Sequence, residues 1–314
     1  MSAVDVLSVG RISVDLYARE PDVGFEGQQS FQKSVGGSPS NVAVAAARLG
    51  HSVMLATKVG ADAFGDYVRQ RMTDWGVDTT YITSQEGSQT PLAFAALTPP
   101  ETPTVMFYRG VAAPDTTLQE DHLPADVVQG AQILWISQAS LSQGSTAETC
   151  LSWMKLRDRS QHTILDLDYR PSLWASPAEA TAMAQRAIAR ATIVVGNREE
   201  CEIALGISDP DAAADELLAM GVRLAIIKLG GDGALLATSK ERVRVAPTPI
   251  EVVCGLGAGD AFGGALCHGV LSEWDLERIG EFANAAGALV ATRLTCADAM
   301  PTVAELETMI GASR

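Results

Sequence analysis

Short β-rich runs alternate with helical segments along most of this chain, and that alternation limits the folds it can adopt. The expected strands are residues 5–10, 52–59, 133–136, 163–167, 192–195 and 224–228, and the expected helices are residues 41–49, 64–75, 146–159 and 178–190. Strands separated by helices predict an α/β fold with a mostly parallel sheet and helices on both of its faces. Ligands of such a sheet bind at the carboxyl ends of the strands.

One part of the chain departs from this alternation. Residues 31–35, 91–97 and 105–108 have strand character, and no helical segment separates the last two. They predict a small β-sheet that stands off the main body as a lid, with strands drawn from about residues 12–35 and 88–110. Residues 1–314 are therefore expected to form a single α/β domain that carries this lid.

Charge and cysteine content narrow the classes of partner and location. The formal net charge is -15 at pH 7, whereas nucleic acids and anionic membrane surfaces are bound by basic patches. The five cysteines are scattered and lack CxxC spacing, so neither a disulfide framework nor a zinc site is expected. These features predict a cytoplasmic protein with a small-molecule ligand.

The strongest local signal is the glycine-rich segment at residues 255–264 (GLGAGDAFGG), which follows a β-rich run at residues 250–253 and precedes an expected helix. Glycines let the backbone approach an anion closely, and a helix N-terminus adds unpaired N–H groups. Asp260 in this segment is predicted to be a base that accepts the proton of an attacking hydroxyl. The alternative is a plain glycine turn with a capping aspartate. The spacing is not that of a P-loop.

Three further segments carry the same kind of signal, and each has an ordinary structural alternative. Residues 36–41 (GGSPSN) suit contact with a polyol but are also typical of a loop that caps a helix. Residues 196–200 (GNREE) follow an expected strand and lie either at a ligand or at an ordinary helix start. Residues 228–234 (KLGGDGA) form either a hairpin turn or a glycine turn against nucleotide phosphates.

These four segments, in this order and in an α/β chain with a β-rich insertion, resemble the ribokinase-like (PfkB) family of carbohydrate kinases. The resemblance runs from residue 6 to about residue 306. It implies a central, mostly parallel sheet flanked by helices, with a β-sheet lid over the sugar site. It also implies an enzyme that uses ATP and Mg²⁺ to phosphorylate a hydroxyl group.

The resemblance assigns roles to individual residues. Those that would bind the sugar are Asp15, Gly36, Gly37 and Asn41. Those that would bind ATP are Asn197, Lys228, Gly230, Gly233 and Asn284, the last as a wall of the adenine pocket. Glu200 completes an NxxE motif with Asn197 and would act indirectly in the Mg²⁺–phosphate environment. The anion hole would be Gly257, Ala258 and Gly259, with Asp260 as the base.

The segment ahead of the glycine turn departs from the family pattern. Many members have Asp-Thr there, and that aspartate contributes to a monovalent-cation site. This chain has Cys254-Gly255-Leu256 instead. A potassium requirement is therefore expected to be weaker in this chain.

Residues 107–109 (FYR), 166–174 (DLDYRPSLW) and 298–301 (DAMP) resemble members of the family that phosphorylate sugar acids. A planar guanidinium binds a carboxylate through two parallel hydrogen bonds, which a neutral sugar cannot reciprocate. Arg109 and Arg170 are therefore predicted to bind the acid group of the substrate. The alternative for each of them is a salt bridge within the protein.

Other functions are compatible with the same fold, because fold alone does not determine function. They are a neutral-sugar kinase, a nucleoside kinase, and a non-catalytic regulator that binds a sugar or a nucleotide. Asp260 favours an enzyme, since a protein that only binds has no use for a base beside an anion hole. The exposed edges of the lid sheet predict a possible homodimer formed through the lid.

Overall fold

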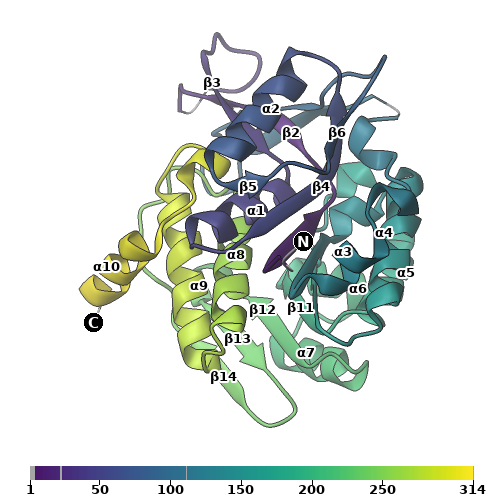
Figure 1. Cartoon of the computed structure of the whole chain (residues 1–314). Coiled ribbons are helices and arrows are strands. Elements are labelled where there is room, and N and C mark those ends of the chain that lie inside the picture. The colour runs from purple at the N-terminus through teal and green to yellow at the C-terminus, as the bar shows by residue number, and fades with distance from the viewer. Residues whose placement is uncertain (1–3, 22, 111, 314) are drawn as a thin grey trace.

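The structure is a computed structural model that describes residues 4–21, 23–110 and 112–313 (Figure 1). Its main sheet has the strand order β14-β13-β12-β11-β10-β9-β1-β4-β5, and β6 pairs with β4. These strands are β1 (Val6–Val9), β4 (Val53–Gly60), β5 (Val77–Asp78), β6 (Ile82–Gln85), β9 (Ile133–Ser137), β10 (His162–Asp166), β11 (Ile193–Asn197), β12 (Leu224–Lys228), β13 (Ala234–Ala237) and β14 (Arg242–Val245). All pairings from β5 to β12 are parallel, and only β13 and β14 are antiparallel. The mostly parallel sheet is confirmed.

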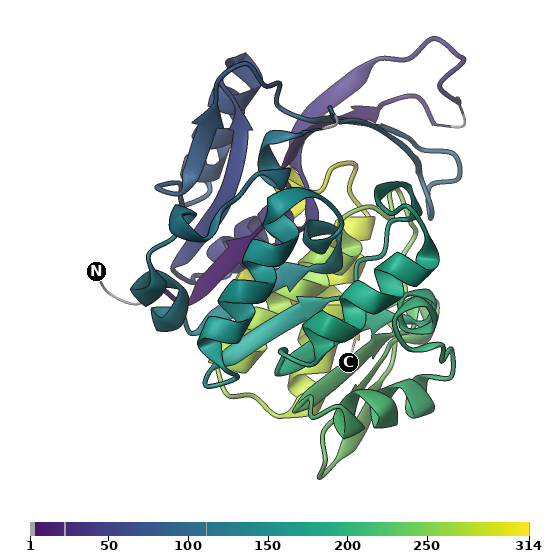
Figure 2. The same ribbon diagram turned by 90° about the vertical axis from the view of Figure 1, so that its right-hand side faces the viewer.

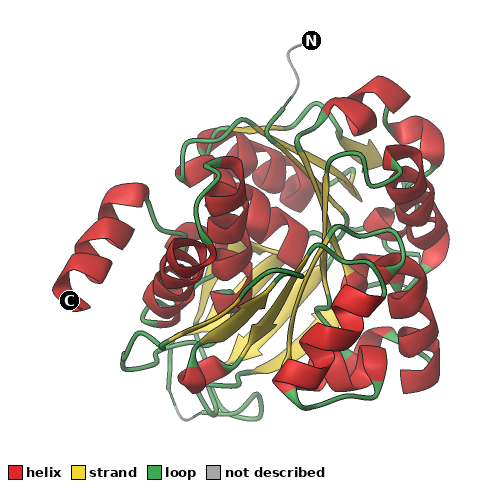
Figure 3. Cartoon of the chain, turned by 90° about the horizontal axis from the view of Figure 1, so that it is seen from below, coloured by secondary structure: helices red, strands yellow, loops and turns green. Residues whose placement is uncertain are grey.

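Helices cover both faces of the main sheet (Figure 3). One face carries α1 (Ser38–Arg48), α2 (Ala63–Asp74), α8 (Ala258–Leu271), α9 (Leu276–Ala291) and α10 (Val303–Ser313). The other carries α3 (Ala125–Gly130), α4 (Gly144–Arg157), α5 (Pro177–Ile188), α6 (Arg198–Leu205) and α7 (Pro210–Ala219). Successive side chains of β9 show why both faces are covered: Trp135 packs into one apolar core and Ile136 into the other.

A second sheet of four strands stands off the main body, as Figure 2 shows. It has the order β3-β2-β7-β8, with β2 (Ser13–Ala18), β3 (Phe31–Gly36), β7 (Leu92–Ala96) and β8 (Thr104–Tyr108). The strands lie in the two parts of the chain from which a lid was expected. The small sheet is therefore present as predicted.

The β-rich run ahead of the glycine turn does not form a strand: residues 250–253 are irregular. The backbone N–H groups of Val253 and Cys254 both donate to the carbonyl of Ala291, at 2.8 and 3.1 Å. Ala291 ends α9, so this segment binds a helix terminus instead of a sheet. The β-rich composition of the run does not reveal this partner of its backbone.

Two further properties of the described residues concern membrane-spanning helices and cysteines. Within residues 4–313, apart from the two gaps, no helix has the length and apolar character needed to cross a membrane. All five cysteines are buried as free thiols: Cys150, Cys201, Cys254, Cys267 and Cys296.

Candidate active site

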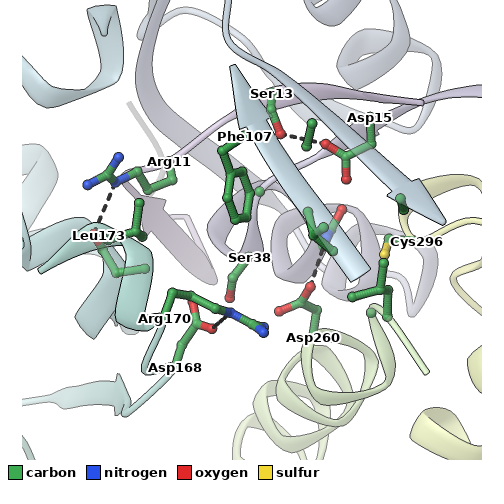
Figure 4. A pocket seen from close by; sticks show the side chains of 18 of the residues that line it. Arg11, Ser13, Asp15, Ser38, Phe107, Asp168, Arg170, Leu173, Asp260 and Cys296 are labelled. Carbon is green, nitrogen blue, oxygen red and sulfur yellow. Dashed lines mark hydrogen bonds and ion pairs between the residues drawn. The ribbon is translucent and has the colours of Figure 1, made fainter. Parts of the chain in front are cut away.

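A cavity of about 250 Å³ lies between the small sheet and the carboxyl ends of the main-sheet strands (Figure 4). Asp15 on β2 and Phe107 on β8 line it from the small sheet. Asp260 on α8 lines it from the main body, together with Arg170, which follows β10. The cavity thus lies at the place that the strand order predicts for a ligand.

Asp260 lies in the first turn of α8, and the glycine before that helix explains how the turn forms. Gly257 caps α8 with φ 82°, a left-handed conformation that favours glycine. A Cβ at this position would also lie 2.6 Å from Sγ of Cys296. The turn therefore needs glycine, and it leaves the first N–H groups of α8 beside the Asp260 carboxylate.

The surroundings of Asp260 suit a general base. Nδ2 of Asn41 donates a hydrogen bond of 2.7 Å to Oδ2 of Asp260. Burial, followed by the negative charge of Asp168, raises the pKa of Asp260 to about 6, against the hydrogen bond from Asn41. A base with a pKa just below neutral is charged at pH 7 and still accepts a proton readily.

Asp15 lines the same cavity within a small hydrogen-bond network. Ser13 Oγ donates to its Oδ1 at 2.6 Å, and the Tyr17 hydroxyl donates to its Oδ2 at 3.1 Å. Burial raises the pKa of Asp15 to about 6 despite these bonds. A Cβ at Gly36 would lie 1.9 Å from Oδ2 of Asp15, so glycine there makes room for the carboxylate. Gly37 also lines the cavity.

The two arginines predicted to bind an acid both line the cavity, and each already has a carboxylate partner. Arg109 forms an ion pair with the fully buried Asp115. Arg170 Nε donates to Asp168 Oδ1 at 2.9 Å, and this ion pair raises the pKa of Arg170. The Arg170 guanidinium points toward Asp260 in Figure 4. The positions of Arg109 and Arg170 are therefore compatible both with binding of an acid group and with a salt bridge within the protein.

A second cavity of about 230 Å³ adjoins the first and is lined by Lys228 and Glu200, two polar residues of the expected phosphate site. Lys228, at the end of β12, lies 3.4 Å from Asp166 Oδ1 and 3.8 Å from Glu200 Oε2. Burial acts to lower the pKa of Lys228, but the carboxylates, Asp166 foremost, outweigh burial and raise it. Gly259 lines this cavity as well.

The predicted pair Asn197 and Glu200 forms a reciprocal cap at the start of α6. Asn197 Oδ1 accepts from the backbone N–H of Glu200 at 2.9 Å, and Glu200 Oε2 accepts from the backbone N–H of Asn197 at 2.7 Å. This capping box fixes the Glu200 carboxylate beside Lys228. The ordinary helix start is therefore present, and Glu200 lines the second cavity; a ligand role for this pair stays a prediction.

Six predicted residues line neither of these two cavities: Gly36, Asn197, Gly230, Gly233, Ala258 and Asn284. Ala258 is the first residue of α8. Gly230 and Gly233 form the turn between β12 and β13, where the hairpin alternative is correct. Asn284 Nδ2 donates to the carbonyl of Ala246 at 3.0 Å. The roles of all six residues in binding the sugar, ATP or the transferred phosphoryl group stay predictions.

The cavities also contain polar residues that the sequence reasoning did not select. Asp168 lines both, Asp166 lines the second, and Arg11 lines the first. Asp166 and Asp168 lie at the carboxyl end of β10, so the argument that selected Asn197 could have found them. Arg11 follows β1 in the same way, but no local motif marks it.

The two cavities share six lining residues: Pro103, Asp168, Arg170, Leu256, Gly257 and Asp260. Asp260 therefore lies at the junction between a pocket with hydroxyl-binding groups and a pocket with a lysine and helix N–H groups. This arrangement can hold a hydroxyl against a polyphosphate, remove the proton of the hydroxyl and stabilise the charge of the transferred group.

Comparison with known proteins identifies the class to which this arrangement belongs. The chain matches the pfkB family carbohydrate kinase over residues 4–303. It therefore belongs to that family, and it is a sugar kinase, a phosphotransferase with a ribokinase-like fold.

Individual relatives agree with this assignment. The chain is 33% identical over 311 residues to the 5-dehydro-2-deoxygluconokinase of Shouchella clausii (strain KSM-K16), covering 98% of this chain and 95% of that protein. A fructokinase with bound ATP from Xylella fastidiosa has a TM-score of 0.86 and 26% identity, over 98% of each chain. A putative ribokinase II from E. coli has a TM-score of 0.90 and 24% identity, over 99% of this chain and 100% of the other, and shows the same fold.

Proposed function

We propose that this kinase transfers the γ-phosphoryl group of ATP to the terminal 6-hydroxyl of a sugar acid, 5-dehydro-2-deoxy-D-gluconate, in myo-inositol catabolism. The observation that carries the sugar-acid assignment is Arg109, a guanidinium-bearing residue that lines the same cavity as Asp260. Relatives of 28–34% identity named 5-dehydro-2-deoxygluconokinase support the choice of acid.

The proposed chemistry starts with the acceptor hydroxyl against Asp260, which takes its proton. The hydroxyl oxygen then forms a bond to the γ-phosphorus while the bond from that phosphorus to the bridging oxygen of ADP breaks. Gly257, Ala258 and Gly259 supply the N–H groups at the start of α8 that stabilise the negative charge of the group in flight. Asp15 and Asn41 bind the other sugar hydroxyls.

ATP is expected in the second cavity, with its phosphates near Lys228. The described residues contain no cluster of three or more metal-ligating side chains. Mg²⁺ commonly uses one or two carboxylates together with substrate phosphates and water, and Asp166 and Glu200 offer such carboxylates. These residues fit a Mg²⁺ ion that neutralises the triphosphate. The bound ATP of the Xylella fastidiosa fructokinase supports the choice of nucleotide.

The arginines have different positions relative to the two ends of the substrate. Arg109 comes from the end of β8 and is proposed to bind the carboxylate when the small sheet closes over the ligand. Arg170 lies where the two cavities meet and faces Asp260 (Figure 4). We therefore place its terminal nitrogens near the reacting end of the acceptor.

A coupled assay of ADP release tests this function. The acceptors are 5-dehydro-2-deoxy-D-gluconate, 2-keto-3-deoxygluconate, fructose and a set of nucleosides. The first acid is expected to have the highest kcat/KM, and ³¹P NMR of its product is expected to show phosphorus coupled to the C6 protons. A preference for fructose would indicate a fructokinase, and no turnover on any sugar would favour a non-catalytic regulator.

Two further features extend the proposal beyond the reaction. Met106, Phe107 and Tyr108 on β8, an edge strand of the small sheet, are exposed, and an unpaired edge with apolar side chains suits pairing with a second copy. We therefore propose a homodimer formed through the small sheet. The free buried thiols suit a reducing compartment, so the proposed location is the cytoplasm.

A further inference from the structure

A third arginine lines the acceptor cavity, and neither the sequence motifs nor the proposed reaction assigns it a role. Arg11 follows the turn that ends β1, and its side chain lies across the cavity from Asp260 in Figure 4. The residue is 4% exposed. Arg11 therefore buries a positive charge at the end of the cavity away from Asp260, and burying a charge costs free energy unless a partner offsets it.

The guanidinium of Arg11 is held in one orientation. Its Nε donates to the carbonyl of Ala139 at 3.0 Å, and its Nη2 donates to Oγ of Ser142. Its Nη1 is buried and has no hydrogen-bond partner within the described part of the chain. A buried donor without a partner costs free energy, which an anion brought to this end of the cavity would offset.

The charge of Arg11 differs from that of the other two arginines. Arg109 and Arg170 each form a direct ion pair with an aspartate, whereas the two hydrogen bonds of Arg11 go to neutral oxygens. Burial, and then the positive charge of Arg109, lowers the pKa of Arg11 to about 10, although the charges of Asp115 and Asp168 act to raise it. The cationic form is therefore destabilised in the absence of an added negative charge.

We propose that Arg11 is a specificity-determining residue that selects an acceptor with a carboxylate at the end opposite its reacting hydroxyl. This inference rests on the proposed function and adds a residue to it. The terminal hydroxyl of an extended acid lies at Asp260, and the carboxylate then lies toward Arg11. Nη1 is covered in this structure, so the selectivity comes from the charge of Arg11, and a direct hydrogen bond would add to it. A neutral sugar adds no negative charge beside Arg11.

The test compares selectivity within one enzyme preparation. For each variant, kcat/KM is measured for 5-dehydro-2-deoxy-D-gluconate and for fructose, and their ratio is independent of the fraction of folded enzyme. Arg11→Met removes the charge, and Arg11→Lys keeps the charge without the planar fork. Arg19→Met is the matched control, since Arg19 is an exposed arginine directly after β2.

Arg11→Met is expected to lower the acid-to-fructose ratio by about 30-fold or more, as loss of a desolvated charge pair does. Arg11→Lys is expected to retain a large part of the ratio, and Arg19→Met all of it. If the wild type prefers the acid and Arg11→Met leaves the ratio unchanged, this inference is overturned and the proposed function is not affected. A wild type that prefers fructose overturns the proposed function, and the inference with it.

Discussion

Asn41 and Asp260 are joined by a hydrogen bond of 2.7 Å, although they lie 219 positions apart in the chain. The bond connects α1, which follows the first glycine pair, to the first turn of α8. It brings together the two sequence segments on which the kinase assignment depended. Because Asn41 donates to the carboxylate, it favours the charged form of the base.

The pH dependence of turnover follows from this arrangement. Asp260 must be deprotonated to accept a proton, so kcat is expected to rise with pH through about 6, the pKa of Asp260. Asn41→Ala removes a hydrogen-bond donor to the Asp260 carboxylate. This raises the pKa of Asp260 and moves the rise of kcat to higher pH. The measurement is kcat against pH at saturating substrates. If kcat rises at the same pH in both enzymes, the hydrogen bond from Asn41 does not change the pKa of Asp260.

Removal of Mg²⁺ is expected to abolish activity. Lys228 lines the phosphate cavity together with Arg170, and Lys228 already faces Asp166 and Glu200. It cannot neutralise a triphosphate by itself. EDTA-treated enzyme should therefore show no ADP release until Mg²⁺ is added in excess. Full activity in EDTA would refute the metal requirement.

Potassium is expected to have a small effect on turnover. Cys254 is buried and Leu256 is apolar, and sulfur is a poor partner for a hard alkali cation that prefers oxygen ligands. Turnover is compared in potassium and tetramethylammonium buffers of equal ionic strength. A large activation by potassium would mean that backbone carbonyls near this segment form a cation site.

Arg170→Met is expected to lower kcat/KM for the acid and for fructose to a similar extent, in contrast to Arg11→Met. Arg170 faces Asp260 at the junction of the cavities, so its charge acts on the reacting end that all acceptors share. A loss on the order of 30-fold or more is expected for a charge-assisted contact. Arg186→Met is the control, because Arg186 is similarly exposed and pairs with Glu148. A loss confined to the acid would place the substrate carboxylate at Arg170 instead.

Much of the fold could be predicted because its signals are local. The strands and helices of the main sheet have apolar runs and terminal glycines that act over a few residues, and the glycine turn before Asp260 requires a left-handed residue at Gly257. The irregular backbone of the β-rich run at residues 250–253 has a tertiary cause. The backbone of that run bonds to the end of α9, which no local pattern reveals.

The difference between local and tertiary signals also explains which site residues the sequence could identify. Asp260, Asn41 and Lys228 belong to glycine-containing motifs, so the sequence marked them. Arg11 belongs to none, and its importance depends on the absence of an ion pair with the described residues and on its position across the cavity. The partners of a buried charge are set by the fold, so they could not be predicted from the sequence.

The most direct test of the catalytic assignment is the turnover of Asp260→Asn. The amide keeps the shape of the side chain and cannot accept the proton of the hydroxyl. We expect kcat to fall by about two to four decades, with the Kd for ATP nearly unchanged by isothermal titration calorimetry. The thermal midpoint should not fall, because the amide replaces a carboxylate whose charged form is disfavoured by burial. A variant that keeps more than about a third of wild-type turnover would contradict the role of Asp260 as the base.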